Sequence, residues 1–156
     1  MKSSKFSAAT INVGNLSMGG TGKSPHIEYL IRLLKENYKI AVLSRGYKRK
    51  SKGFIIADSS SDASQIGDEP YQYYQKFNDV IIAVDADRVN GITQLKALQN
   101  PPEIILLDDA YQHRKVNADF NILLTPFNDL YVDDNVLPSG NLREKVKGAE
   151  RAQVIV

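Results

Sequence analysis

The chain has 156 residues, enough for one domain with a single buried core. Its 20 basic and 18 acidic residues leave a net charge of +2, which argues neither for nor against nucleic acid, and no nucleic-acid partner is expected. The absence of cysteine excludes disulfides, thiolate metal sites and a cysteine nucleophile, and is compatible with a reducing compartment. No apolar run approaches the length of a membrane span, and residues 1–5 lack the apolar core of a signal peptide. We therefore expect a soluble or peripheral protein.

Short apolar runs alternate along the chain with stretches of helical spacing, and this order predicts a parallel α/β sheet. The expected strands lie near residues 7–13, 39–44, 53–57, 79–84, 103–108, 119–124 and 152–156, and the expected helices near 25–36, 68–77 and 87–99. A polar loop is expected at 58–64. Tyr71, Tyr74 and Phe77 recur at helical spacing and predict a core stripe. The predicted fold class is α/β, a three-layer P-loop NTPase-like fold whose mostly parallel sheet is flanked by helices.

Residues 14–25 read Gly-Asn-Leu-Ser-Met-Gly-Gly-Thr-Gly-Lys-Ser-Pro and predict a phosphate-binding loop between a strand and a helix. Glycines permit backbone angles and a close approach that side chains forbid, so successive N–H groups and the helix N-terminus can surround a phosphate. The strict pattern for such loops fails at its first glycine, where Ser17 stands, although Gly14 lies just upstream. A nucleoside triphosphate is the expected ligand. The expected binding residues are Gly19, Gly20, Thr21, Gly22, Lys23 and Ser24.

A second signal is the apolar run at 104–107, which ends in Asp108 and Asp109. In phosphate-loop proteins such a strand lies beside the loop, and its acid holds Mg²⁺ directly or through water. A strand that ends in aspartate is also common at ordinary turns, but the neighbouring phosphate loop favours the metal-binding interpretation. The hydroxyl of Ser24 is expected to be a further Mg²⁺ ligand.

Several short motifs follow one another in a fixed order along the chain. They are Val13-Gly14-Asn15 with Gly19 to Pro25, Leu43-Ser44-Arg45-Gly46-Tyr47, Gly67-Asp68-Glu69-Pro70, Val84-Asp85-Ala86-Asp87-Arg88, Asp108-Asp109-Ala110-Tyr111-Gln112-His113 and Leu137-Pro138-Ser139-Gly140-Asn141-Leu142-Arg143-Glu144. Together they resemble the tetraacyldisaccharide 4′-kinase family, the lipid A 4′-kinases, over nearly the whole chain. The resemblance implies transfer of the γ-phosphoryl of ATP to the 4′-hydroxyl of a tetraacylated glucosamine disaccharide, at the cytoplasmic face of the bacterial inner membrane.

The chain departs from the family pattern in three ways. Ala110 stands where the family usually has a glycine after its acidic pair. Family members also carry an N-terminal membrane-associating helix before the phosphate loop, and a second α/β lobe that closes on the nucleotide and contributes a catalytic histidine. Neither region is recognised here, so we expect residues 1–156 to form a single P-loop kinase core.

The resemblance favours Asp68 as the base that deprotonates the sugar hydroxyl, although a helix cap would also explain this aspartate. Arg88 and Arg143 are assigned to anionic groups, because a guanidinium binds phosphate bidentately and keeps its charge; surface ion pairing is the alternative. The expected catalytic residues are Lys23, Asp68, Arg88, Asp108 and Asp109, the expected substrate-binding residues are Asn15, Arg88, Arg143 and Glu144, and the expected metal ligands are Ser24, Glu69, Asp108 and Asp109.

Two further features have an open interpretation. His113 is expected to orient the carboxylate of Asp108 or Asp109 without itself binding the metal. A basic loop either lies against an anionic membrane or is simply solvated. This loop contains Arg45, Lys48, Arg49, Lys50 and Lys52.

Two rival functions remain. Partitioning and metal-insertion ATPases share the Gly-Gly-x-Gly-Lys-Ser or Thr loop but carry a signature lysine just before the two glycines, where this chain has Met18. A GTPase is disfavoured because no Asn-Lys-x-Asp motif occurs. The other alternative is a nucleotide-binding module or catalytically inactive remnant.

Overall fold

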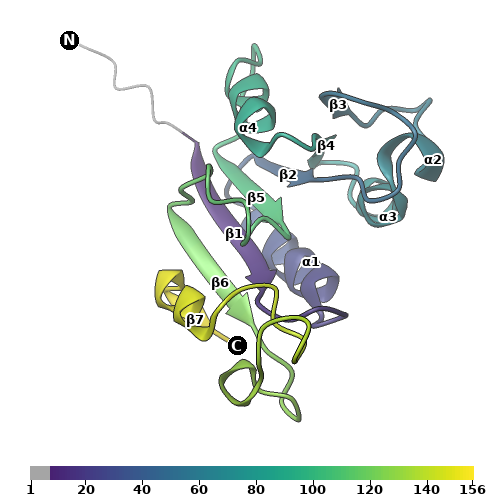
Figure 1. Cartoon of the computed structure of the whole chain (residues 1–156). Coiled ribbons are helices and arrows are strands. Elements are labelled where there is room, and N and C mark those ends of the chain that lie inside the picture. The colour runs from purple at the N-terminus through teal and green to yellow at the C-terminus, as the bar shows by residue number, and fades with distance from the viewer. Residues whose placement is uncertain (1–7) are drawn as a thin grey trace.

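The computed structural model describes residues 8–156, in which a seven-stranded sheet carries helices on both faces (Figure 1). The strands are β1 (Ala9–Asn15), β2 (Ile40–Ser44), β3 (Ile55–Ile56), β4 (Ile81–Val84), β5 (Ile104–Asp108), β6 (Phe120–Leu124) and β7 (Val154–Ile155). The helices are α1 (Lys23–Leu34), α2 (Ala63–Ile66), α3 (Asp68–Lys76) and α4 (Arg88–Lys96), with 3₁₀ helices η1 (Tyr131–Asp133) and η2 (Val146–Arg151). Within the described residues all the expected strands and helices are confirmed, with ends that shift by a few residues, and residue 7 of the first expected strand lies outside the described part of the chain.

The strand order is β3-β4-β2-β5-β1-β6-β7, and every pair is parallel except β3 with β4. This confirms a mostly parallel sheet. Strand β1 lies between β5 and β6, and Val13 of β1 pairs with Asp108 of β5. The phosphate loop therefore follows a strand in the interior of the sheet and not a strand at its edge.

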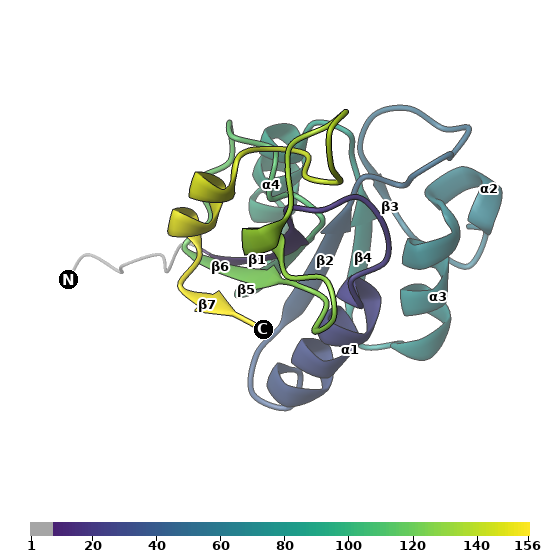
Figure 2. The ribbon, with the colours of Figure 1, turned by 60° about the horizontal axis from the view of Figure 1, so that its bottom comes forward.

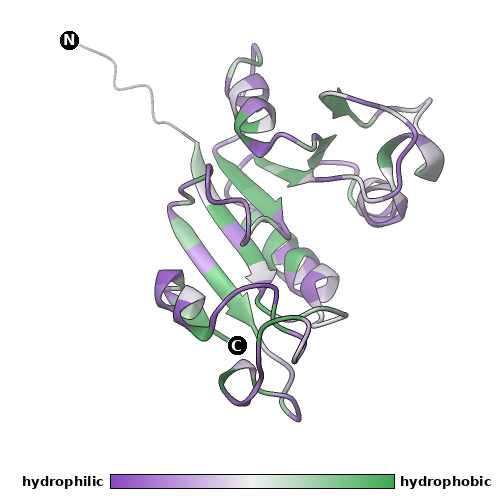
Figure 3. Ribbon diagram, viewed as in Figure 1, coloured by the Kyte–Doolittle hydropathy of each residue, from purple (hydrophilic) through white to green (hydrophobic). Residues whose placement is uncertain are grey.

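Side chains alternate along each strand, and this alternation divides the core between two faces. Leu106 packs in the cluster that contains the buried isoleucines of α1 and the buried tyrosine of α3, whereas Ile105 and Leu107 pack in the cluster that contains the buried leucine of α4. Figure 2 shows α1 and α4 on opposite sides of the sheet. Figure 3 shows that hydrophobic colour is concentrated in the strands, as expected for strands that are buried on both faces. Within residues 8–156, no helix is both long enough and apolar enough to cross a membrane.

Two local expectations were wrong. The loop predicted at 58–64 contains the start of α2, because the Asp62 carboxylate accepts a hydrogen bond from the Gln65 N–H at 2.9 Å and so caps a short helix. The stripe predicted on α3 was wrong at one position. Phe77 is buried in the core and Tyr74 packs against it, but the buried tyrosine is Tyr73 and not Tyr71.

Gly14 belongs to strand β1 and not to the phosphate loop. A Cβ atom added at this position would lie 2.6 Å from the Cβ of Tyr111. The glycine therefore makes room for a buried tyrosine that follows the acidic pair, and it does not replace the missing first glycine of the loop pattern.

We expect Gly14→Ala to lower the free energy of unfolding by about 1–3 kcal/mol, because the new methyl group overpacks the contact with Tyr111. Gly20→Ala is the matched control, since nothing lies within 4 Å of a Cβ built there. Chemical denaturation of both variants measures the difference. Equal stability of the two variants would contradict the packing role of Gly14.

Candidate active site

The phosphate loop, residues 16–22, connects the carboxyl end of β1 to α1. Gly19 and Gly22 have φ angles of 103° and 77°, a region that favours glycine. Gly22 is the N-cap of α1, so the helix begins with Lys23 and Ser24. A helix N-terminus carries unpaired N–H groups and a partial positive charge, and both suit a phosphate. The loop, the lysine and the serine thus lie together at the end of β1.

A second segment, residues 141–143, holds the first half of the loop. The Met18 N–H donates to the Asn141 carbonyl at 2.8 Å, and the Arg143 N–H donates to the Leu16 carbonyl at 2.7 Å. The leucine between the two hydrogen-bonded residues of this segment is fully buried. Sequence reasoning missed this pairing, although an apolar residue between polar neighbours was a signal for it.

Neighbouring parallel strands bring further side chains to the edge where the loop begins. Asp108 ends β5 beside the loop strand, as the sequence predicts. Arg45 follows β2, and Arg88 begins α4 shortly after β4. Because β4, β2, β5 and β1 are adjacent and parallel, their carboxyl ends meet at one edge of the sheet, which is where α/β proteins usually bind ligands.

A cavity of about 860 Å³ lies at this edge. The predicted site residues that line it are Lys23, Asp68, Glu69, Arg88, Asp108, Asp109, Arg143 and, from the loop, Gly19. Asn15 and Glu144 do not line this cavity. Four further predicted residues, Gly20, Thr21, Gly22 and Ser24, belong to the loop and the start of α1 but are not part of the cavity lining. The structure therefore brings eight of the fourteen predicted residues to one cavity.

Ser24, Glu69, Tyr73 and Asp108 form a connected polar cluster. The Ser24 hydroxyl donates to Glu69 Oε1 at 3.0 Å, and the Tyr73 hydroxyl donates to Asp108 Oδ2 at 3.4 Å. Asp108 Oδ1 is buried and has no hydrogen-bond partner among the described residues. Burial raises the pKa of Asp108 to about 7, and the charge of Glu69 acts in the same direction.

This cluster fits a magnesium ion that is shared with a phosphate. Within residues 8–156, no group of three or more His, Cys, Asp or Glu is arranged to hold a metal ion by itself. Mg²⁺ usually binds only one or two carboxylates and completes its shell with water and substrate phosphates. Ser24, Glu69 and Asp108 offer the hard oxygen donors that it prefers, and the unpartnered Oδ1 of Asp108 lacks the partner that a cation or its water would supply.

Asp109 has quite different partners from Asp108. The Arg143 guanidinium donates to both carboxylate oxygens of Asp109, at 3.2 and 3.0 Å, and the Lys23 ammonium lies 3.9 Å from Asp109 Oδ2. Asp109 also has a positive φ of 52°, which turns the chain sharply after β5. Since two cations neutralise Asp109, the geometry favours Asp108 over Asp109 as the metal ligand.

Arg88 is buried at the base of the cavity. Its guanidinium donates to the backbone carbonyls of Asp85 and Asp108, at 2.7 and 3.3 Å. Burial lowers the pKa of Arg88 to about 10, and the charge of Asp108 opposes that shift, so the side chain stays protonated near pH 7. Arg88 Nε has no partner among the described residues. Arg88 thus supplies a fixed positive charge and not a mobile surface cation.

Asp68 is the first residue of α3 and its side chain is exposed. The N-cap of this helix is Gly67, whose φ is 96° and which makes no side-chain cap bond. The hypothesis that Asp68 serves as the helix cap is therefore wrong. A Cβ atom on Gly67 would lie 3.0 Å from the Cα of Gly46, so two glycines let the turns that carry Arg45 and Asp68 touch.

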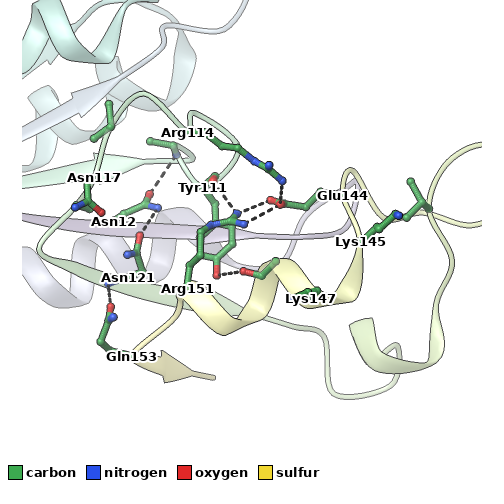
Figure 4. Close-up of a pocket in the computed structure, with 15 residues that line it drawn as sticks. Asn12, Tyr111, Arg114, Asn117, Asn121, Glu144, Lys145, Lys147, Arg151 and Gln153 are labelled. Atoms are coloured by element: carbon green, nitrogen blue, oxygen red, sulfur yellow. Dashed lines mark hydrogen bonds and ion pairs between the residues drawn. The ribbon is translucent and has the colours of Figure 1, made fainter.

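Glu144 lines a second cavity, of about 910 Å³, which Figure 4 shows. Its carboxylate accepts hydrogen bonds from Arg151 at 2.7 and 3.0 Å and from Arg114 at 3.1 Å. On another wall of this cavity, Asn12 donates to Asn121 at 3.0 Å (Figure 4). Glu144 thus joins two arginines, and its role in substrate binding stays a prediction.

His113 lines the first cavity, but the expected bond to the acidic pair is not formed. His113 Nε2 is buried without a hydrogen-bond partner among residues 8–156. Its backbone N–H donates to the Ala110 carbonyl at 2.9 Å, which closes the turn after the acidic pair.

The raised pKa of Asp108 makes stability depend on pH. Between the unfolded pKa of about 4 and the folded pKa of about 7, the folded state binds more protons, so the free energy of unfolding falls as pH rises. Asp108→Asn keeps this group neutral. Without metal, we expect the variant to exceed the parent chain in stability at pH 8 by up to about 4 kcal/mol, and by much less at pH 5.

Denaturant titrations with a chelator at both pH values measure this difference. Asp109→Asn is the control and should be destabilised at both pH values, because it weakens the ion pair with Arg143. Parallel pH profiles for Asp108→Asn and the parent chain would show that Asp108 does not titrate in this range.

The glycine-rich loop between a central parallel strand and a helix, with a lysine and a serine at the helix start and an aspartate on the adjacent strand, defines a P-loop protein of the three-layer α/β class. The sequence profile described as tetraacyldisaccharide-1-P 4′-kinase matches residues 1–156. The chain belongs to this family.

Individual relatives agree with this assignment. A tetraacyldisaccharide 4′-kinase of Flavobacterium johnsoniae is 63% identical over 156 residues, and one of Bacteroides fragilis is 54% identical over 157. Each alignment covers 100% of this chain, but only 46% and 42% of the relative. The LpxK of Aquifex aeolicus, solved in complex with ATP, has a TM-score of 0.84 and 41% identity, over 95% of this chain and 47% of that one. The chain thus spans a little under half the length of these relatives.

Proposed function

We propose that the chain is the nucleotide-binding core of a kinase that phosphorylates the 4′-hydroxyl of a tetraacylated glucosamine disaccharide 1-phosphate. The observation that carries the proposal is that Lys23 of the phosphate loop and Asp68 line the same cavity. A phosphate site and a candidate base for a hydroxyl acceptor therefore share one space. Membership of the family supplies the identity of the acceptor.

ATP is the proposed donor, and its phosphates would lie against the loop and the N-terminus of α1. Lys23 would provide a positive charge to these phosphates, and the backbone N–H groups around Gly22 would provide hydrogen bonds. Ser24, Glu69 and Asp108 would hold Mg²⁺. A bound Mg²⁺ would neutralise charge on the phosphates.

In the transfer step, the carboxylate of Asp68 would take the proton of the 4′-hydroxyl. The acceptor oxygen then forms a bond to the γ-phosphorus, and the bond between that phosphorus and the bridging oxygen of ADP breaks. Lys23 and Arg88 would stabilise negative charge during this transfer, since both are cations that line the cavity. The exposed position of Asp68 at the rim suits contact with a large acceptor.

Membrane contact at the cytoplasmic face of the inner membrane is part of the proposal. The loop after β2 supports it only in part. Arg49 donates to the Ser51 hydroxyl and to the Gly53 carbonyl, so it holds the loop together, whereas Lys48, Lys50 and Lys52 are exposed. Exposed lysines near an anionic surface contribute about 1 kcal/mol each.

The first test concerns nucleotide binding. We expect the chain to bind ATP, and Lys23→Ala to weaken binding by about 10-fold or more, because it removes a charge-assisted hydrogen bond to phosphate. Lys115→Ala is the control, because Lys115 is exposed and does not line the cavity. Calorimetric titration gives the dissociation constants, and identical values for Lys23→Ala and the parent chain would exclude the loop as the ATP site.

The second test concerns the acceptor and needs a polypeptide of the relatives' full length. In that protein, Asp68→Asn should lower kcat by about 10²–10⁴-fold with little change in KM for ATP, because a general base acts in the transition state. A steady-state assay with ATP and the lipid acceptor measures both constants. Unchanged kcat would remove Asp68 from the chemistry. ATP binding without any transfer to lipid would favour a nucleotide-binding module, and ATP hydrolysis without an acceptor would favour an ATPase.

A further inference from the structure

Asn15, the last residue of β1, is fully buried although its side chain is polar. Each of its polar side-chain atoms has a partner. Oδ1 accepts from the Lys23 ammonium at 3.2 Å and also from the Arg143 guanidinium, and Nδ2 donates to the Ser17 carbonyl at 2.9 Å. The bond to Ser17 fixes the amide so that its oxygen faces the two cations.

The backbone carbonyl of Asn15 is engaged as well. It accepts from Arg143 at 2.8 Å and from the Gln112 side-chain amide at 2.8 Å. One residue thus joins the loop lysine, the segment at 141–143 and the turn after the acidic pair. Because Asn15 is buried and does not line the cavity, it has no surface with which to touch a substrate.

The chemistry of an amide suits this position. The Lys23 side chain is only 15% exposed, and a cation that loses water needs polar partners. A carboxylate would supply them but would also neutralise the charge, as Asp109 does for Arg143. The neutral amide oxygen of Asn15 orients the ammonium without adding a negative charge to that of Asp109, whose Oδ2 lies 3.9 Å from the Lys23 ammonium.

We propose that Asn15 is a positioning residue that holds the Lys23 ammonium in place for the phosphates of the nucleotide, without contacting the nucleotide itself. This inference rests on the proposed function, since it requires that ATP binds at the loop. It gives Asn15 a role different from the substrate contact that the sequence suggested.

The test is a double-mutant cycle on ATP binding, made with the parent chain, Asn15→Ala, Lys23→Ala and the double variant. We expect Asn15→Ala to weaken ATP binding by about 5-fold in the parent background and by less than about 2-fold in the Lys23→Ala background, because residues that act through one another are not additive. Asn121→Ala is the matched control. Asn121 is a half-buried amide on the neighbouring strand β6 that accepts from Asn12 and does not line the ATP cavity, so its loss should leave the ATP dissociation constant unchanged.

Thermal unfolding identifies variants that fail to fold. If Asn15→Ala shows no cooperative transition, the cycle is repeated with Asn15→Asp, which keeps an oxygen facing Lys23 and should again be non-additive with Lys23→Ala. Equal losses in the two backgrounds would overturn the inference while the proposed function stands. A parent chain that does not bind ATP would overturn the proposed function and this inference with it.

Discussion

Strand β1 pairs with β5 on one side and with β6 on the other, and the candidate site depends on this pairing. The register that sets Val13 opposite Asp108 puts the acid beside the start of the phosphate loop. A slip of one residue would turn every side chain of β1 to the opposite face of the sheet. The same pairing places Gly14 against Tyr111, which anchors the turn after the acidic pair. The pairing of β1 with β5 therefore sets both the position of the phosphate loop and the position of Asp108.

Charge separation is the second organising feature of the site. Asp108 and Asp109 are adjacent in sequence, yet the Asp108 side chain accepts from Tyr73 and is affected by the charge of Glu69, whereas Asp109 pairs with Arg143 and Lys23. Burial raises the pKa of Asp108, whose Oδ1 has no hydrogen-bond partner among the described residues, and a divalent cation would relieve this unfavourable environment. The positive φ of Asp109 turns the chain so that consecutive carboxylates point to different partners. One short turn thus directs one carboxylate toward the proposed metal site and the other toward two cations.

The segment at 141–143 shows why a phosphate loop needs support from distant parts of the chain. Glycines allow the loop its geometry, but they also increase the number of conformations that the loop can adopt. Two backbone hydrogen bonds to this segment and the buried leucine within it restrict the first half of the loop. Asn15 then connects the restricted loop to Lys23 and Arg143. When the groups of a site are already ordered, less of the favourable free energy of ligand binding is lost to ordering them.

Local features of this protein were readable from its sequence. Strands, helices and the phosphate loop follow from short-range patterns, because apolar alternation, glycine at positive φ and a lysine at a helix start act over a few residues. The family motifs also contain many of the residues that line the cavity at the end of β1. The sequence could not decide which of several similar side chains is buried and which of them pairs with a charged partner. Tyr73 replaced Tyr71 in the core although the start of α3 was predicted correctly, because the packing of the helix against the sheet sets which face is buried. The different partners of Asp108 and Asp109, the burial of Asn15 and the pairing of Glu144 with two arginines depend on contacts between residues far apart in the chain. Only the tertiary structure decided these, because burial and charge pairing are properties of the assembled neighbourhood and not of the residue.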